Sequence, residues 1–227
     1  MSSFKERLLK VIPGGAHTYS RGHDQFPSNA PQILSRGEGA YVFCPKGKRW
    51  LDYGMGLRAV NIGYSEPEID QAAFDAIKSG NNLTRPSMIE LESAEKLVDL
   101  ISTAEMVKFT KNGSTSVTAA VKLSRAFTNR DKIIRCTQQP FLSYDDWFIA
   151  STPVKRGIPD DISKNIMHFS YGDVTALTSL FERFPNQVAC VIIEAATTEH
   201  PPADFLEAVG RLCKENGAVF VLDEMIT

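Results

Sequence analysis

Short apolar runs alternate with longer amphipathic segments through the second half of the chain. Four runs have the length and composition of buried strands: residues 106–110, 132–136, 188–194 and 218–224. Three segments repeat apolar residues at helical spacing: residues 115–127, 174–184 and 204–216. Strands that alternate with helices of this length need crossover connections, which give parallel pairing and place helices on both faces of the sheet. The pattern therefore predicts an α/β fold built on a mostly parallel sheet.

The pattern is less regular before residue 106. Residues 11–32 are rich in Gly, Pro, Ser and Asn, which predicts an irregular arm. Residues 40–53 place two short β-rich runs around the turn sequence PKGK, which predicts a small antiparallel hairpin. We therefore expect residues 1–60 to form an arm and hairpin segment and residues 61–227 to form the larger α/β domain.

Two further helices are predicted between the hairpin and the first apolar run. Residues 66–79 carry apolar side chains at helical spacing and are followed by Gly80, a common helix stop. Residues 87–101 open with Ser87 and Glu90 at the spacing of a capping box. The apolar positions of this second helix are expected to form a buried stripe: Ala94, Leu97, Val98 and Ile101.

The net charge, the length of the apolar runs and the spacing of Cys and His limit the kinds of ligand and partner that we expect. The formal net charge of -2 gives no basic surface for nucleic acid or for an anionic membrane. No apolar run approaches the roughly 18 residues of a membrane span, and the polar start lacks the apolar stretch of a signal peptide. The four cysteines form no C-x-x-C pair and the four histidines have no ligand-like spacing, which argues against a metal site. We expect a cytoplasmic protein that acts on small molecules.

The turn after residues 106–110 is the first candidate for chemistry. It runs from Lys111 through Asn112, Gly113 and Ser114 directly into a helix, so backbone N–H groups and small hydroxyls meet at the positive end of the helix dipole. A phosphate fits such a site, and glycine allows close approach of the backbone. A loop that only caps the helix explains the same residues equally well. Both glycine-rich nucleotide signatures are absent, so another phosphorylated ligand is needed.

Two more residues fall where open α/β sheets bind ligands. Asp223 stands at the carboxyl end of the last predicted strand, where a ligand is expected. It is also suited to capping a following helix. Phe141 follows the strand at residues 132–136 and is placed to stack on a planar ring, with an ordinary core position as the alternative.

In combination these segments resemble the fold-type I pyridoxal-phosphate (PLP) enzymes, specifically class III aminotransferases of the glutamate-1-semialdehyde 2,1-aminomutase group. The likeness begins at VIPGGAH, continues through GEGAYVFCPKGKRWLDYGMG, NIGYSEPEI and MVKFTKNGSTSVTAAVKLSRAFTNRDKII, and reaches VLDEMIT. It therefore covers nearly the whole chain. The resemblance implies a PLP cofactor, amino and keto or aldehyde substrates, and a homodimer in the complete parent protein.

The resemblance also assigns roles at the cofactor. Asn112, Gly113 and Ser114 match the loop that binds the cofactor phosphate through backbone N–H groups. Phe141 matches the aromatic residue that stacks on the pyridine ring, and Asp223 matches the aspartate that bonds the ring nitrogen. A carboxylate there keeps the nitrogen protonated, which allows the cofactor to act as an electron sink.

Other matches concern the substrate, and some positions depart from the family. Glu194 matches a family glutamate, although Ala195 replaces the proline that follows it, and Arg21 matches an arginine that grips the substrate carboxylate in the aminomutase. The family usually shows Tyr-His-Gly where this chain has Phe-Leu-Ser at 141–143, and the aminomutase's active-site tryptophan corresponds to Leu57. These departures favour a related aminotransferase over an enzyme for glutamate-1-semialdehyde itself.

The Schiff-base lysine of the family has no match in this chain. Lys111 lies on the phosphate side and matches no family lysine, so we interpret it as a solvated loop charge. The resemblance implies that residues 61–227 are an incomplete PLP-binding large domain and that the small C-terminal domain is absent. We expect such a chain to be inactive alone.

Three functional readings are open at this point. The chain is the N-terminal part of a PLP-dependent aminotransferase or aminomutase, or it is a non-catalytic PLP-fold remnant that acts as a binding or assembly subunit. A Rossmann-like oxidoreductase is a third and weaker reading, because the glycine fingerprint of that fold is missing.

Overall fold

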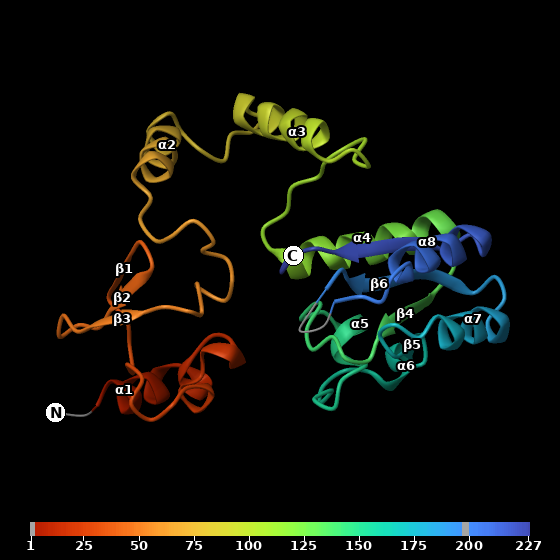
Figure 1. Ribbon diagram of the computed structural model, residues 1–227, viewed down its shortest axis with the longest axis horizontal. Coiled ribbons are helices and arrows are strands. Elements are labelled where there is room, and N and C mark those ends of the chain that lie inside the picture. The colour runs from red at the N-terminus through yellow and green to blue at the C-terminus, as the bar shows by residue number, and fades with distance from the viewer. Residues whose placement is uncertain (1–2, 197–199) are drawn as a thin grey trace. The chain divides into compact units, whose positions relative to one another are not determined.

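The computed structural model describes residues 3–196 and 200–227 (Figure 1). The chain separates into two compact units, Met1–Leu91 and Glu92–Thr227. The first unit consists of short elements, and the second contains the parallel sheet. The domain boundary expected after residue 60 stays a prediction.

The first unit begins with a short helix and a small antiparallel sheet. Helix α1 (Phe4–Val11) was not predicted, and it is opened by a capping box in which Ser3 and Glu6 bond each other's backbone N–H groups. Three single-turn 3₁₀ helices follow: Pro13–Gly15, Tyr19–Arg21 and His23–Gln25. The sheet has the order β1 (Arg36–Glu38), β2 (Tyr41–Phe43), β3 (Arg49–Leu51). Antiparallel pairing of β2 with β3 confirms the predicted hairpin.

The two predicted helices after the hairpin are present as α2 (Pro67–Lys78) and α3 (Met88–Leu100). The capping box of α3 is confirmed, because Ser87 N donates to Glu90 Oε2 at 2.6 Å and Glu90 N donates to Ser87 Oγ at 3.4 Å. The predicted buried stripe of α3 is wrong: among the described residues of this helix none is buried. The apolar spacing defines a face, which the described residues of the chain cover only in part.

The second unit is built on a four-stranded sheet in the order β5-β4-β6-β7, with all three pairings parallel. The strands are β4 (Lys132–Cys136), β5 (Ile166–Phe169), β6 (Val188–Glu194) and β7 (Val219–Asp223). The predicted α/β class and the mostly parallel sheet are therefore confirmed.

The strand prediction fails at two places. Residues 106–110 have no regular secondary structure, and Met106 is 90% exposed. A strand requires a neighbour to receive its backbone hydrogen bonds, and no described residue pairs with this run. Strand β5 was missed because it has only four residues and includes the polar His168.

Helices cover both faces of this sheet, as predicted: α4 (Gly113–Thr128), α5 (Asp146–Ile149), α6 (Asp160–Ser163), α7 (Val174–Arg183) and α8 (Phe205–Glu215). Alternate strand residues point to opposite faces. One core contains Ile133 and Ile192 with side chains from α4 and α5, and the other contains Ile134 and Ile193 with side chains from α7 and α8. The two cores hold the carboxyl ends of the strands in fixed positions.

Among the described residues no helix has the length and apolar character needed to cross a membrane. Within the same residues no group of three or more His, Cys, Asp or Glu side chains is arranged to hold a metal ion.

Candidate functional site

Strand β6 and the neighbouring edge strand β7 end in two carboxylates that stand side by side. In the parallel register of β6 and β7, Glu194 lies opposite Asp223. The backbone N–H of Ala195 donates to the carbonyl of Asp223 at 3.1 Å, which continues the pairing by one residue. The chain then turns, and Met225 N donates to Asp223 Oδ1 at 2.9 Å. This turn fixes the Asp223 side chain, and within residues 3–196 and 200–227 its second oxygen has no hydrogen-bond partner.

Helix α4 begins with a cap that leaves two donors available. Asn112 Oδ1 accepts from the backbone N–H of Thr115 at 2.9 Å and from its hydroxyl at 3.1 Å. The first N–H groups of a helix have no partner within the helix, and those of Gly113 and Ser114 make no hydrogen bond within the part of the chain that the structure describes. The side chain of Asn112 therefore acts as a cap, while two adjacent N–H groups at the positive helix end face outward.

The start of α4 lies against the turn that follows Asp223. A Cβ atom built on Gly113 would come within 2.7 Å of Met225 Cε, so only a residue without a side chain fits there while Met225 keeps this position. Helix α4 also packs on β6 and β7, and the chain end lies beside the start of α4 (Figure 1). The structure therefore brings the predicted phosphate turn and the predicted ring-nitrogen partner to the same end of the sheet.

The loop after β4 reaches the same helix start. Tyr144 N donates to Ser114 Oγ at 3.3 Å, and Ser143 Oγ donates to the carbonyl of Ser114 at 3.4 Å. Phe141 lies on this loop with 55% of its surface exposed and meets Phe148 edge to face at 5.8 Å between ring centroids. An aromatic ring with one exposed side remains available to a planar ligand, whereas a core position would have hidden it.

Glu194 is buried at the edge of this site, and its surroundings include a residue that sequence reasoning missed. Gln139 Nε2 donates to the carbonyl of Glu194 at 3.1 Å, and both residues are buried. The Tyr171 hydroxyl donates to the carbonyl of Ala195 at 2.6 Å. Burial raises the pKa of Tyr171, and the nearby Cys136 and Glu194 raise it further. Tyr171 therefore stays a neutral donor that holds the backbone after β6.

Arg21 belongs to the first unit and is described there alone. It ends the 3₁₀ turn Tyr19–Arg21 and is exposed. Burial and then the hydrogen bond to Asp52 raise the pKa of Tyr64, and the charge of Arg21 makes a smaller, opposite contribution. Tyr64 donates this bond to Asp52 Oδ2 at 2.6 Å. The substrate-binding role of Arg21 stays a prediction.

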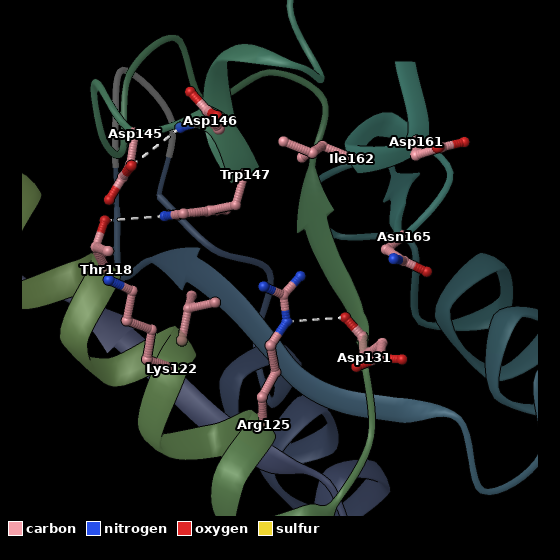
Figure 2. Close-up of a pocket in the computed structure, with 11 residues that line it drawn as sticks. Thr118, Lys122, Arg125, Asp131, Asp145, Asp146, Trp147, Asp161, Ile162 and Asn165 are labelled. Atoms are coloured by element: carbon pink, nitrogen blue, oxygen red, sulfur yellow. Dashed lines mark hydrogen bonds between the residues drawn. The ribbon is translucent and has the colours of Figure 1, made fainter. Parts of the chain in front are cut away.

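An open pocket of about 440 Å³ lies on the flank of α4, next to the loop that carries Phe141 (Figure 2). Its lining includes the cations Lys122 and Arg125 and several aspartates, and Arg125 Nε donates to the carbonyl of Asp131 at 3.0 Å. Trp147 forms part of the wall, and its Nε1 donates to Thr118 Oγ1 at 3.0 Å (Figure 2). The wall of this pocket is therefore tied to the helix that starts at the phosphate turn.

The arrangement can hold a ligand that is anionic at one end and carries an N–H donor at the other. Two free N–H groups and a helix dipole attract a phosphate, while a free carboxylate oxygen on Asp223 accepts from a protonated ring nitrogen. Phe141 offers an exposed aromatic surface beside the helix start. The geometry thus fits a phosphorylated aromatic ring, although the sequence-derived roles of these residues stay predictions.

The chain matches one family model, described as aminotransferase class-III, over residues 19–227. Among solved structures it is similar to the FumI protein of Sphingopyxis sp. MTA144 in its PLP internal aldimine form, with 27% identity, a TM-score of 0.88, and coverage of 97% of this chain and 53% of that chain. A transaminase with PLP bound gives 25% identity, a TM-score of 0.88, and coverage of 97% and 54%. An omega-transaminase from Sphaerobacter thermophilus, at 23% identity, a TM-score of 0.89 and coverage of 98% and 54%, shows the fold alone. The chain thus spans about half the length of these structures.

Proposed function

The chain belongs to the class-III aminotransferase family, and from this premise we propose that it forms the cofactor-holding part of a PLP-dependent enzyme. That enzyme transfers an amino group between an amino acid and a keto or aldehyde compound. One observation carries the proposal: the free N–H groups at the start of α4 and the carboxylate of Asp223 lie at the same end of the sheet, with Gly113 against Met225. One phosphorylated pyridine would contact both the N–H groups of α4 and the Asp223 carboxylate.

The phosphate end of the cofactor would be held by the first turn of α4. The N–H groups of Gly113 and Ser114 and the helix dipole favour a dianion there. Ser114 adds a hydroxyl donor, because its oxygen already accepts from Tyr144 N and its proton is left for a ligand. Asn112 contributes indirectly, since its side chain is committed to Thr115.

The ring end of the cofactor would be held by Asp223 and Phe141. One carboxylate oxygen of Asp223 accepts from Met225 N, and the other is left to accept from a protonated ring nitrogen. Negative charge at this position favours the protonated nitrogen. When bound, PLP supplies an electron sink for the bond that breaks at the substrate carbon. Phe141 would limit tilting of the ring by contact with its face, and buried Glu194 would support the strand end beside it.

The substrate and the remaining groups are also part of the proposal. Arg21 would bind the substrate carboxylate with its guanidinium fork. The Schiff-base lysine of the family would lie outside the 227 residues, and residues 61–227 would form part of the PLP-binding large domain, after an arm and hairpin at 1–60. The complete parent would be a cytoplasmic homodimer without nucleic-acid or membrane partners, an aminotransferase or an aminomutase of the glutamate-1-semialdehyde type.

Pyridoxamine 5'-phosphate tests the site directly, because it has no aldehyde and cannot react with surface lysines. We expect equilibrium dialysis to show binding to the purified chain and roughly 10- to 100-fold weaker binding to Asp223→Asn, which keeps an acceptor for Met225 N but loses the charge. Asp131→Asn is the matched control, since its exposed side chain makes no described hydrogen bond, and it should bind like the wild type. Equal binding by both variants, with unchanged circular dichroism, would overturn the proposal.

The alternative of a non-catalytic PLP-fold remnant is separated by a second experiment. If the chain is part of an enzyme, supplying a lysine-bearing segment of the family, on the same or a separate chain, should produce amino-group transfer that Asp223→Asn abolishes. Binding of pyridoxamine 5'-phosphate without any transfer in that assembly would favour the remnant.

A further inference from the structure

A series of buried hydrogen bonds joins the loop that carries Phe141 to the start of α4. Ser143 is fully buried, and Thr118 and Trp147 are nearly so. Ser143 Oγ lies 3.0 Å from Thr118 Oγ1. Trp147 Nε1 donates to the same Thr118 oxygen at 3.0 Å, as Figure 2 shows. Buried hydroxyls need partners, and here each one has at least two.

One direction of these hydrogen bonds gives every proton an acceptor. The indole of Trp147 is a donor only, so Thr118 Oγ1 accepts from it. With the single proton of Ser143 Oγ directed at the carbonyl of Ser114, Thr118 is the donor in the contact between the two hydroxyls, and both hydroxyl protons then have an acceptor. Asp145 N donates to Ser143 Oγ as well, at 3.1 Å. The order is therefore Trp147 to Thr118, Thr118 to Ser143, and Ser143 to Ser114.

Ser114 is held by the loop at two of its atoms. Its carbonyl accepts from Ser143 Oγ, and its hydroxyl oxygen accepts from Tyr144 N. Two bonds from neighbouring loop residues restrict both the peptide and the side chain of Ser114. The same loop carries Phe141 two residues before Ser143, so the position of the aromatic ring and the position of Ser114 are set together.

We propose that Ser143 is a positioning residue that couples the phosphate turn at Ser114 to the ring surface of Phe141, through the contacts of Thr118 and Trp147. The inference rests on the proposed function and deepens it. Ser143 itself is fully buried, so it would act through Ser114 and the loop and not by contact with the ligand. Removal of the Ser143 hydroxyl should make Ser114 and Phe141 less well positioned at the same time, so that the phosphate contact and the ring contact both weaken.

A double-mutant cycle measures this coupling. We expect Ser143→Ala to weaken binding of pyridoxamine 5'-phosphate about tenfold, the effect of one lost hydrogen bond. Phe141→Ala should weaken binding in the wild-type background but have a clearly smaller effect in the Ser143→Ala background. Ser124→Ala is the matched control, because Ser124 is a buried serine of α4 whose hydroxyl donates to Ala120 O, and it should leave the affinity unchanged.

Conservative variants separate positioning from general stability. Thr118→Ser keeps the hydroxyl and should keep the affinity, whereas Thr118→Val removes it and should behave like Ser143→Ala. Without any ligand, hydrogen exchange of the amide of Tyr144 should be faster in Ser143→Ala than in Ser124→Ala, since Tyr144 N bonds Ser114.

The outcomes also distinguish this inference from the proposed function. Wild-type binding with additive effects of Ser143→Ala and Phe141→Ala would overturn the coupling and leave the function standing. Failure of the wild type to bind pyridoxamine 5'-phosphate would overturn both. Unchanged exchange at Tyr144 in Ser143→Ala would overturn the positioning role whatever the ligand does.

Discussion

At the scale of single residues, the four cysteines differ sharply in their surroundings. Cys44 is half-buried near the hairpin, whereas the other three are buried in the second unit. Burial raises the pKa of Cys136 to about 12, that of Cys190 to about 11 and that of Cys213 to about 12. Because the thiolate is the nucleophile, these three thiols are unreactive in the folded chain.

We therefore expect a chromogenic disulfide reagent at pH 8 to titrate one thiol in the native chain and four after unfolding in urea. The native signal should belong to Cys44, so Cys44→Ser should remove it without changing the other three. Rapid reaction of two or more thiols under native conditions would show that the core around β4, β6 and α8 is open to solvent.

Residues at strand ends could be found from the sequence, whereas their supporting contacts could not. Asp223 and Phe141 were placed by the rule that ligands bind at the carboxyl ends of parallel strands. Ser143 meets Thr118 across 25 positions in the sequence, through a loop whose path depends on packing of Trp147. No local pattern predicts such a pair, and the same holds for Gln139 and the carbonyl of Glu194.

At the scale of elements, the capping box of α3 links helix stability to pH. The backbone N–H of Ser87, and then its hydroxyl, lower the pKa of Glu90 from the ordinary value of 4.5. A carboxyl whose pKa is lower in the folded state contributes stability above its unfolded pKa and loses it as pH falls through the folded pKa. The start of α3 is therefore best capped at neutral pH and fraying increases in acid.

A carboxyl titration followed by NMR checks this directly. The midpoint of Glu90 should lie below 4.5 in the wild type and return only part of the way in Ser87→Ala, since the backbone N–H of residue 87 remains. A full return to 4.5 would show that the hydroxyl, and not the backbone, is the main cause.

Core strands carry more of the stability than the outer helices. Ile192 of β6 is fully buried, while Ile69 of α2 is 53% exposed. We expect Ile192→Ala to lower the free energy of unfolding by about 2–5 kcal/mol, through lost burial and the cavity left behind. Ile69→Ala should change it by less than about 0.5 kcal/mol in urea unfolding. Similar losses for both would mean that α2 is covered in solution.

Helices and strands could be predicted from the sequence where the residues that determine them are close together in the chain. Helix spacing, the cap at Ser87 and the strands β4 and β6 depend on neighbouring residues and were predicted correctly. Residues 106–110 have the same apolar composition as a strand, but strand formation depends on a pairing edge that periodicity cannot reveal. For the same reason the apolar spacing of α3 identified a face without showing whether anything covers it.

At the scale of the whole molecule, burial is distributed unevenly between the two units. Of the buried hydrophobic side chains in the described residues, all except Val42 lie in Glu92–Thr227. Helices α2 and α3 have no buried residue among those described. Segments with little buried apolar surface open at low free-energy cost, because few contacts are lost when they unfold.

Limited proteolysis should reflect this difference. We expect trypsin to cut first within residues 1–91 and to leave a resistant product that contains β4 to β7. Mass spectrometry of the early products identifies the sites. Early cleavage at Lys132 or Arg135, which lie on β4, would contradict the prediction, because those peptide bonds are inside the sheet.

Strand β6 has a consequence for how the second unit responds to stress. All seven of its side chains are buried, and from Cys190 to Ile193 they alternate between the core shared with α4 and the core shared with α7 and α8. Neither layer can melt while the other stays intact, because both would lose the same strand. Heat or denaturant should therefore unfold the start of α4 at Ser114 and the α7–α8 layer in a single cooperative transition. Ligand binding at Ser114 would then report whether the whole second unit is folded.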